Sequence, residues 1–209
     1  MREKQMLSLR DKVAREAALL LYQGQEKEYK QAKIKAAKTL GARVLPSNSE
    51  VAVMLDKIAD EREGEERKKR LVTMREEALQ IMKLLQNMHP VLIGSVWRGT
   101  AHKNSDIDVV VFHENPNAVL QVLNQNNFNV AKTEWQTVTK HGERIQSFHI
   151  NLTLPSSNKV EIIVRDPERI ERKEKCEIYG DVQSGLNIQQ LQNTLKTMPT
   201  KKFTPQEQF

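Results

Sequence analysis

The sequence has little of what marks secreted, membrane-spanning or disulfide-linked proteins. Its 209 residues include a single cysteine, Cys176, which excludes an internal disulfide and a cysteine-based zinc site. No apolar run approaches the roughly 20 residues that a membrane-spanning helix needs. The N-terminal segment MREKQMLSLRDK is charged where a signal peptide would be apolar. We therefore expect a cytoplasmic protein that makes no membrane contact.

The motifs of several large enzyme classes are also missing. No Gly-rich loop is followed by Lys-Ser or Lys-Thr, as a P-loop requires, and there is no Gly-x-Ser-x-Gly elbow. The five histidines are scattered and form no His-x-x-x-His pair, the spacing that zinc peptidases use. These absences argue against P-loop NTPases, α/β-hydrolases and zinc peptidases.

Charge is abundant but unevenly spread. Charged residues make up 29% of the chain and aromatic residues 5%, which is typical of a protein with much helical surface. Residues 1–85 contain 19 Lys and Arg against 14 Asp and Glu, whereas the rest of the chain contains 14 against 13. The basic excess therefore lies in the N-terminal part. The lysine run over residues 27–38 fits either a solvated helix face or a nucleic-acid contact, and both interpretations stay open.

Apolar residues at helical spacing predict helices throughout this N-terminal part. The expected helices cover residues 11–21, 27–40, 51–58 and 71–85, and the second is expected to stop at Gly41, a good C-terminal cap. Ser47 and Glu50 have the spacing of a capping box, which would start the third helix. Gly64 lies in the charged run that follows, and it is expected either to break or to thin the helix.

The pattern changes after Pro90, and the expected domains follow from that change. We expect a basic helical region over residues 1–70, a catalytic domain over 71–200 and a flexible tail over 201–209. Short β-branched runs predict strands at 91–93, 108–112, 128–135, 144–154 and 159–164, the last two as a hairpin. Further helices are expected at 118–123, 167–177 and 187–197. The predicted fold class is α+β, with a mixed sheet and helices preceded by the helical region.

The most informative stretch runs from Gly94 to Asp108. Residues two apart on a strand point the same way, so Asp106 and Asp108 present two carboxylates on one face. A divalent cation would relieve their repulsion, and oxygen ligands suit Mg²⁺. Gly94 and Ser95 directly follow a predicted strand, where exposed amides and a hydroxyl can hold phosphate oxygens. Further candidate donors to a triphosphate are Arg98, Thr100, Lys103 and Ser105.

Glu161 is the candidate for a third carboxylate. It lies between apolar residues of the last predicted strand and must face something polar. Three carboxylates on adjacent strands can hold two Mg²⁺ ions, the arrangement used for in-line phosphoryl displacement. If Glu161 faces solvent instead, Glu143 and Asp166 are the next candidates. His149 is expected to be a satisfied sheet histidine, and Trp97 either stacks on a base or packs the turn.

These residues resemble the signature of a known family. Gly94-Ser95, ten intervening residues, Asp106-Ile107-Asp108 and a later strand carboxylate are similar to the pattern of the nucleotidyltransferase superfamily related to DNA polymerase β. The stretch looks especially like the minimal nucleotidyltransferases of toxin–antitoxin pairs and the catalytic domains of archaeal CCA-adding enzymes. The resemblance covers about residues 75–165.

The resemblance implies roles for five residues. Gly94 and Ser95 would bind the triphosphate, and Asp106 and Asp108 would bind metal. Glu161 would be the third carboxylate and would assist deprotonation of the acceptor hydroxyl. The chain departs from the family in one respect, because many members have Asp at the position of Glu161.

The implied activity is Mg²⁺-dependent transfer of a nucleoside monophosphate from an NTP, either ATP or CTP, to a hydroxyl, with release of pyrophosphate. The basic N-terminal helices favour RNA, such as the end of a tRNA, as the acceptor. One alternative is nucleotidylation of a protein or small molecule, for example AMPylation, as in antitoxin-type relatives. Another is a catalytically silent module that binds nucleotide or RNA. The sequence does not distinguish a monomer from a homo-oligomer.

Overall fold

A computed structural model describes residues 8–140 and 143–205 of the protein. These residues form two compact units, and each unit has a hydrophobic core of its own. The first unit contains the described residues up to 67 with 102–104 and 175–181, and the second contains 68–101, 105–174 and the described residues from 182 onward. The three candidate carboxylates Asp106, Asp108 and Glu161 therefore all lie in the second unit.

Three helical segments build the first unit. They are α1 (Leu9–Tyr22), α2 (Tyr29–Thr39) and the first part of α3 (Asn48–Leu84). Ala14, Ala17 and Ala36 are at most 2% exposed in the core of this unit. Small side chains at a helix contact shorten the distance between helix axes, so these alanines let the short helices pack closely.

The start of α3 and its interruption agree with the sequence. The backbone N–H of Glu50 donates to Ser47 Oγ at 3.1 Å, and the Ser47 N–H donates to Glu50 Oε2 at 2.6 Å. These two bonds confirm the predicted capping box. Gly64 has φ 52° and ψ −133°, far from helical values. Of the two outcomes expected for Gly64, the structure shows a break.

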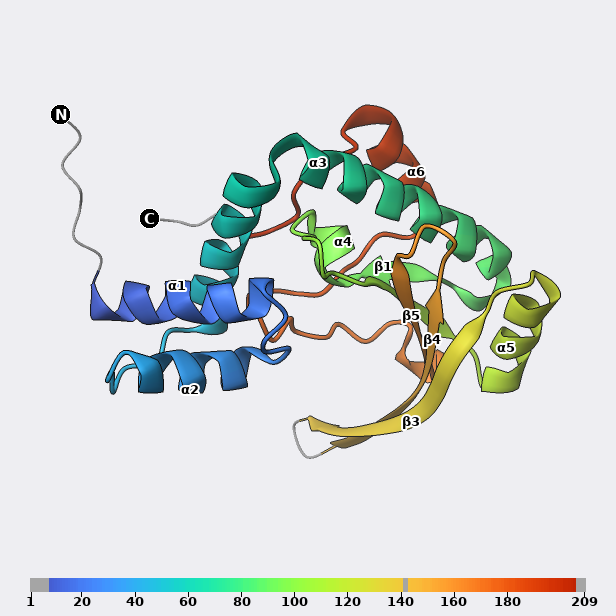
Figure 1. The fold of residues 1–209 in the computed structure, drawn as a ribbon. Helices are drawn as coiled ribbons and strands as arrows, with labels where there is room; N and C mark the ends of the chain where they lie inside the picture. Colours follow the sequence, from blue (N-terminus) through green and yellow to red (C-terminus); the bar gives the residue numbers. More distant parts are fainter. Residues whose placement is uncertain (1–7, 141–142, 206–209) are drawn as a thin grey trace. The chain divides into compact units, whose positions relative to one another are not determined.

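A five-stranded mixed sheet forms the second unit. Its strands are β1 (Val91–Ile93), β2 (Ile107–Phe112), β3 (Val130–Lys140), β4 (Glu143–Thr153) and β5 (Lys159–Arg165). The order across the sheet is β1-β2-β5-β4-β3, in which β2 and β5 run parallel and the other neighbours run antiparallel (Figure 1). The α+β class, the mixed sheet and the hairpin of the last two strands are confirmed.

Alternation along the strands gives the sheet one apolar and one polar face. Val109, Ile150 and Ile162 are fully buried in the core, to which the second part of α3, α5 (Pro116–Gln125) and α6 (Ile188–Thr197) also contribute. Asp108 and Glu161 alternate with these residues and point to the opposite face. The single turn α4 (Gly94–Arg98) connects β1 toward β2.

Strand β3 and the segment after β5 differ from the prediction. β3 covers 130–140 instead of 128–135, because residues 136–140 pair with β4. The helix expected at 167–177 is absent, and only the 3₁₀ turn η2 (Pro167–Arg169) forms there. Ile170 is the single apolar side chain in 168–175, so no apolar stripe exists to hold a helix against the core.

The C-terminal segment also differs from the expected tail. The N–H of Phe203 donates to Arg98 O at 2.8 Å, and Phe203 packs against the core. Residues 206–209 of that expected tail lie outside the described residues. Among the described residues, no helix is both long and apolar enough to cross a membrane.

Candidate active site

Strands β2 and β5 place two carboxylates side by side. Their parallel register pairs Asp108 with Glu161, and β4 pairs Asn151 with Glu161. Paired residues point to the same face of a sheet, so Asp108 and Glu161 share the polar face. Asp106 is exposed and directly precedes β2.

The charges of these three carboxylates interact. The pKa of Asp108 is raised from 3.8 to about 8, first because the carboxyl is desolvated and then because Glu161 and Asp106 are negatively charged. In the absence of a compensating cation, Asp108 therefore holds a proton at neutral pH. Asp106 and Asp108, predicted from their spacing, and Glu161, predicted from its place on the last strand, therefore interact electrostatically in the structure.

Gly94 brings the turn after β1 against this group. Its φ is +70°, in the left-handed region that favours glycine. A Cβ built on Gly94 would overlap with Asp108 Oδ2 and would lie 2.9 Å from Asp108 Cγ. Only a residue without a side chain allows the backbone to approach the Asp108 carboxylate this closely.

His149 contacts Glu161 directly. His149 Nδ1 lies 2.8 Å from Glu161 Oε1, and His149 Nε2 lies 2.8 Å from Ser147 Oγ. In a neutral imidazole with this tautomer, Nδ1–H donates to the carboxylate and Nε2 accepts from the hydroxyl. The histidine is a satisfied sheet residue, as predicted. Its contact with Glu161 is a feature that the sequence does not indicate.

The carboxylates fit a hard divalent cation by their chemistry. Asp106, Asp108 and Glu161 supply the oxygen ligands that Mg²⁺ prefers, and the raised pKa of Asp108 reflects a charge that a cation would compensate. In this conformation Glu161 Oε1 is bound to His149. Within residues 8–140 and 143–205, no three side chains of His, Cys, Asp and Glu converge on one point that could hold a metal ion. The donor set is thus present but is not gathered around one position.

α4 carries the predicted phosphate-binding residues. Gly94 and Ser95 form its beginning, and the Thr100 N–H donates to Ser95 O at 3.0 Å. Ser95, Thr100 and Ser105 are half-buried, and Ser105 immediately precedes Asp106. These residues lie in the same unit as the carboxylates.

Arg98 and Trp97 lie inside the protein. Trp97 is 3% exposed, so of its two interpretations the structure shows packing of the turn. The Arg98 guanidinium lies 4.0 Å from the centroid of the Trp97 ring and donates to Phe203 O at 2.7 Å. These contacts tie the C-terminal segment to α4, whereas the sequence suggests that Arg98 contacts a triphosphate.

Lys103 belongs to the first unit. Its backbone N–H donates to Glu63 Oε1 at 3.1 Å, and its Nζ lies 4.8 Å from the centroid of the Tyr22 ring. Its predicted contact with a triphosphate stays a prediction.

A buried arginine holds α4 in place. Arg75 is fully buried, and its guanidinium donates to the backbone oxygens of Val96, Trp97, Pro199 and Lys201 at 2.6 to 3.1 Å. Four carbonyl acceptors replace the water that this charge loses. The sequence carries one signal for it, because Arg75 lies four residues after Leu71 and three before Ala78 on the apolar stripe of α3.

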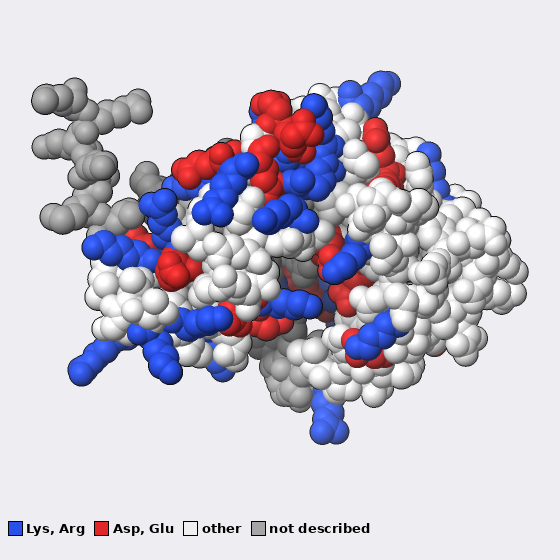
Figure 2. All heavy atoms as spheres, viewed as in Figure 1, with Lys and Arg blue, Asp and Glu red and all other residues white. Residues whose placement is uncertain are grey.

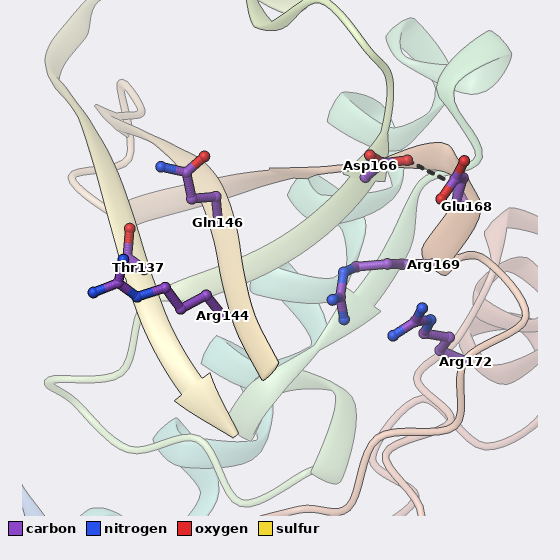
Figure 3. A pocket seen from close by; sticks show the side chains of 7 residues that line it. All are labelled: Thr137, Arg144, Gln146, Asp166, Glu168, Arg169 and Arg172. Atoms are coloured by element: carbon purple, nitrogen blue, oxygen red, sulfur yellow. Dashed lines mark hydrogen bonds between the residues drawn. The ribbon is translucent and has the colours of Figure 1, made fainter. Parts of the chain in front are cut away.

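The two alternative acids do not lie beside Asp108 on the sheet. Asp166 follows β5, accepts the Glu168 N–H at 2.9 Å and lines a pocket with residues of the β3–β4 hairpin (Figure 3). The side chain of Glu143 lies outside the described residues.

A known protein family matches the part of the chain that contains these residues. The sequence profile of the nucleotidyltransferase domain matches residues 75–182, just over half of the chain. No curated protein matches the sequence significantly.

Among solved structures, the chain is similar to Cid1, an RNA terminal uridylyl transferase, with 19% identity and a TM-score of 0.33 over 46% of this chain and 30% of that chain. It is also similar to a cytoplasmic RNA terminal U-transferase, with 21% identity and a TM-score of 0.29 over 56% of this chain and 34% of that chain. The chain thus covers about a third of the length of these proteins.

Proposed function

Because the chain belongs to the family of nucleotidyltransferase domains, we propose that it transfers a nucleoside monophosphate from an NTP, ATP or CTP, to a hydroxyl acceptor. The acceptor oxygen attacks the α-phosphorus, the bond from that phosphorus to the bridging oxygen breaks, and pyrophosphate leaves. The observation that carries the proposal is the pairing of Asp108 with Glu161 beside the Gly94 backbone.

Each residue of the group has a part in this reaction. Gly94 and Ser95 bind the triphosphate through backbone amides and the hydroxyl, with Thr100 and Ser105 as the further predicted donors in the same unit. Asp106 and Asp108 hold Mg²⁺, with Glu161 as a ligand to a second ion. Bound Mg²⁺ supplies positive charge that offsets the charge of the phosphates. Glu161 draws the proton from the acceptor hydroxyl, and His149 orients the Glu161 carboxylate.

RNA is the proposed acceptor. The first unit carries Lys30, Lys33 and Lys38 on α2, and Figure 2 shows Lys and Arg side chains over α1 and α2 on the face drawn. Cations that contact phosphates release counterions, which drives binding of a polyanion. By contrast, α5 has no charged residue.

Labelling tests the proposal. The protein is incubated with Mg²⁺ and each of the four NTPs, labelled at the α-phosphate, together with total RNA or cell lysate. We expect label on RNA with the wild type and none with Asp106→Ala or Asp108→Ala, both of which should stay folded. If the label appeared on a protein or small molecule instead, that molecule and not RNA would be the acceptor. No label on any acceptor would leave a silent nucleotide- or RNA-binding module, and full activity in either alanine variant would contradict the assigned metal site.

A further inference from the structure

The outer part of the β3–β4 hairpin extends beyond the five-stranded sheet. Residues 148–153 of β4 pair with β5, whereas residues 143–147 pair with β3 alone. Figure 1 shows the hairpin projecting past the other strands. On one face of this ribbon the side chains of Trp135, Thr137 and Gln146 are exposed.

Trp135 is an exposed aromatic residue on this hairpin. It is 59% exposed, the highest value among the large apolar side chains in the described part of the chain. The ring of Phe148 meets it edge to face at a centroid distance of 5.2 Å, so the Trp135 ring is supported from one side. The rest of the indole surface is open to a partner.

A pocket of about 610 Å³ lies on the same face of the hairpin. Thr137 and Gln146 line it and form a cross-strand pair, next to the pair of Trp135 with Phe148 along the same face. The remaining lining residues are Arg144, Asp166, Glu168, Arg169 and Arg172. Figure 3 shows Arg169 and Arg172 reaching from the segment after β5 toward the hairpin strands.

The charges of the pocket favour a ligand with both phosphates and hydrogen-bond donors. Three guanidinium groups suit phosphate oxygens, because their planar donors bind such oxygens in pairs. The carboxylates of Asp166 and Glu168 would repel a bare anion. A nucleotide satisfies both kinds of group, because its base amino groups and ribose hydroxyl can donate to carboxylates.

We propose that Trp135 and this arginine-lined pocket bind a single-stranded segment of the RNA acceptor. One base stacks on the open face of the Trp135 indole, and the adjoining phosphates contact Arg144, Arg169 and Arg172. The surface lies on the sheet face opposite to Asp108 and Glu161. The RNA segment that it binds is therefore not the end that reacts at these carboxylates. The inference rests on the proposed function in taking RNA as the acceptor.

Tryptophan fluorescence reports on this surface directly, because the chain has two tryptophans and Trp97 is buried. The full-length protein is titrated with a single-stranded uridine oligonucleotide at low salt, without Mg²⁺. We expect quenching with the wild type, no quenching with Trp135→Phe, and about tenfold weaker binding by fluorescence anisotropy with Trp135→Ala. Binding without any change in Trp135 emission would overturn the stacking contact.

A charge-matched pair of double variants tests the arginines. Arg169→Gln with Arg172→Gln should weaken oligonucleotide binding about tenfold or more and leave NTP binding unchanged. Lys83→Gln with Lys196→Gln removes the same charge from exposed helix positions of the same unit, and it should weaken binding by less than threefold. Equal losses in both double variants would show a general charge effect and would overturn the pocket. Circular dichroism establishes that each variant is folded.

The failure of this surface is distinguishable from the failure of the proposed function. If RNA is labelled equally well by wild type and Trp135→Ala at limiting RNA concentration, the acceptor is RNA but it binds elsewhere. If label appears on a protein or small molecule and the oligonucleotide does not bind, both RNA as the acceptor and this surface are wrong. Nucleotidyl transfer itself would then still stand.

Discussion

The backbone of Gly94 lies directly against the carboxylate of Asp108. Asp108 lies on β2, and Gly94 directly follows Ile93, the residue of β1 that pairs with Asp108. Since a Cβ at residue 94 would overlap with Asp108 Oδ2, the contact depends on the absence of a side chain. The turn expected to bind phosphate and the aspartate expected to bind metal are therefore coupled through one glycine.

Gly94→Ala is expected to abolish nucleotidyl transfer and to weaken NTP binding at least tenfold, because Asp108 or the turn must move. Gly180→Ala is the matched control. Gly180 also has a positive φ of +75°, but a Cβ there would meet nothing within 4 Å. Both variants should lose roughly 1–2 kcal/mol of stability from backbone strain, and only the first should lose activity. Activity lost equally in both would show that strain, not the contact, matters.

The stability of the metal-free protein should fall as the pH rises from about 5 to 8. The folded pKa of Asp108, about 8, lies above its unfolded value of 3.8. Between these values the folded state holds a proton that the unfolded state has released, so stability decreases with rising pH. The stabilisation is full below the unfolded pKa and is lost as the pH passes the folded pKa.

Urea unfolding at several pH values in the presence of a chelator measures this effect. Asp108→Asn should remove most of the slope and should be more stable than wild type at pH 8 by on the order of a few kcal/mol. Mg²⁺ should stabilise the wild type at pH 8 more than the variant. An identical pH slope in both proteins would contradict the raised pKa.

Glu161→Gln should separate NTP binding from transfer. The substitution keeps the shape of the side chain but removes the charge that draws the acceptor proton. NTP binding, measured by equilibrium dialysis, should stay near normal while transfer falls on the order of 10²-fold or more. Glu134→Gln is the control, since Glu134 is paired across the strands with His149 on the same face but contacts Lys132. Equal turnover in wild type and Glu161→Gln would place Glu161 outside the reaction.

Arg75→Met should destabilise the second unit by about 3 kcal/mol or more, because four carbonyl oxygens, two of them in buried hydrogen bonds, lose their donor. Arg75→Lys should recover only part of the loss, because an ammonium has three N–H donors and cannot satisfy all four acceptors. Deleting residues 199–209 removes two of these acceptors and should also weaken NTP binding through α4. Chemical denaturation measures the stability. If Arg75→Met were as stable as the wild type, Arg75 would not hold α4 in place.

Neutralising lysines of α2 should weaken RNA binding more than NTP binding. The triple variant Lys30→Gln, Lys33→Gln and Lys38→Gln removes three cations from a helix whose core side is formed by alanines. The slope of log K for RNA binding against log salt concentration should become less steep. The change should correspond to the loss of up to about three phosphate contacts. Anisotropy titrations at several salt concentrations measure the slope. An unchanged slope would show that these lysines form a solvated helix face.

Local patterns in the sequence predict much of the fold and the candidate site. Helical spacing identifies the N-terminal helices, and β-branched runs identify five strands, because periodicity depends only on neighbouring residues. The prediction of a helix at 167–177 is wrong, because the charged residues there give no apolar stripe that could pack against the core. The longer β3 could not be predicted, because its added residues are ordered by pairing with β4.

The sequence by itself determined that Gly94, Ser95, Asp106 and Asp108 lie around the beginning of one buried strand, because these residues are linked by a short stretch of chain. Only the tertiary structure decided which distant acid joins them. The parallel register of β2 and β5 pairs Glu161 with Asp108 and leaves Asp166 beyond the end of β5. Likewise, only the structure shows that the buried side chains of Arg75 and Arg98 donate to backbone carbonyl oxygens. Registers and burial arise from contacts between residues far apart in the chain, and no local pattern encodes them.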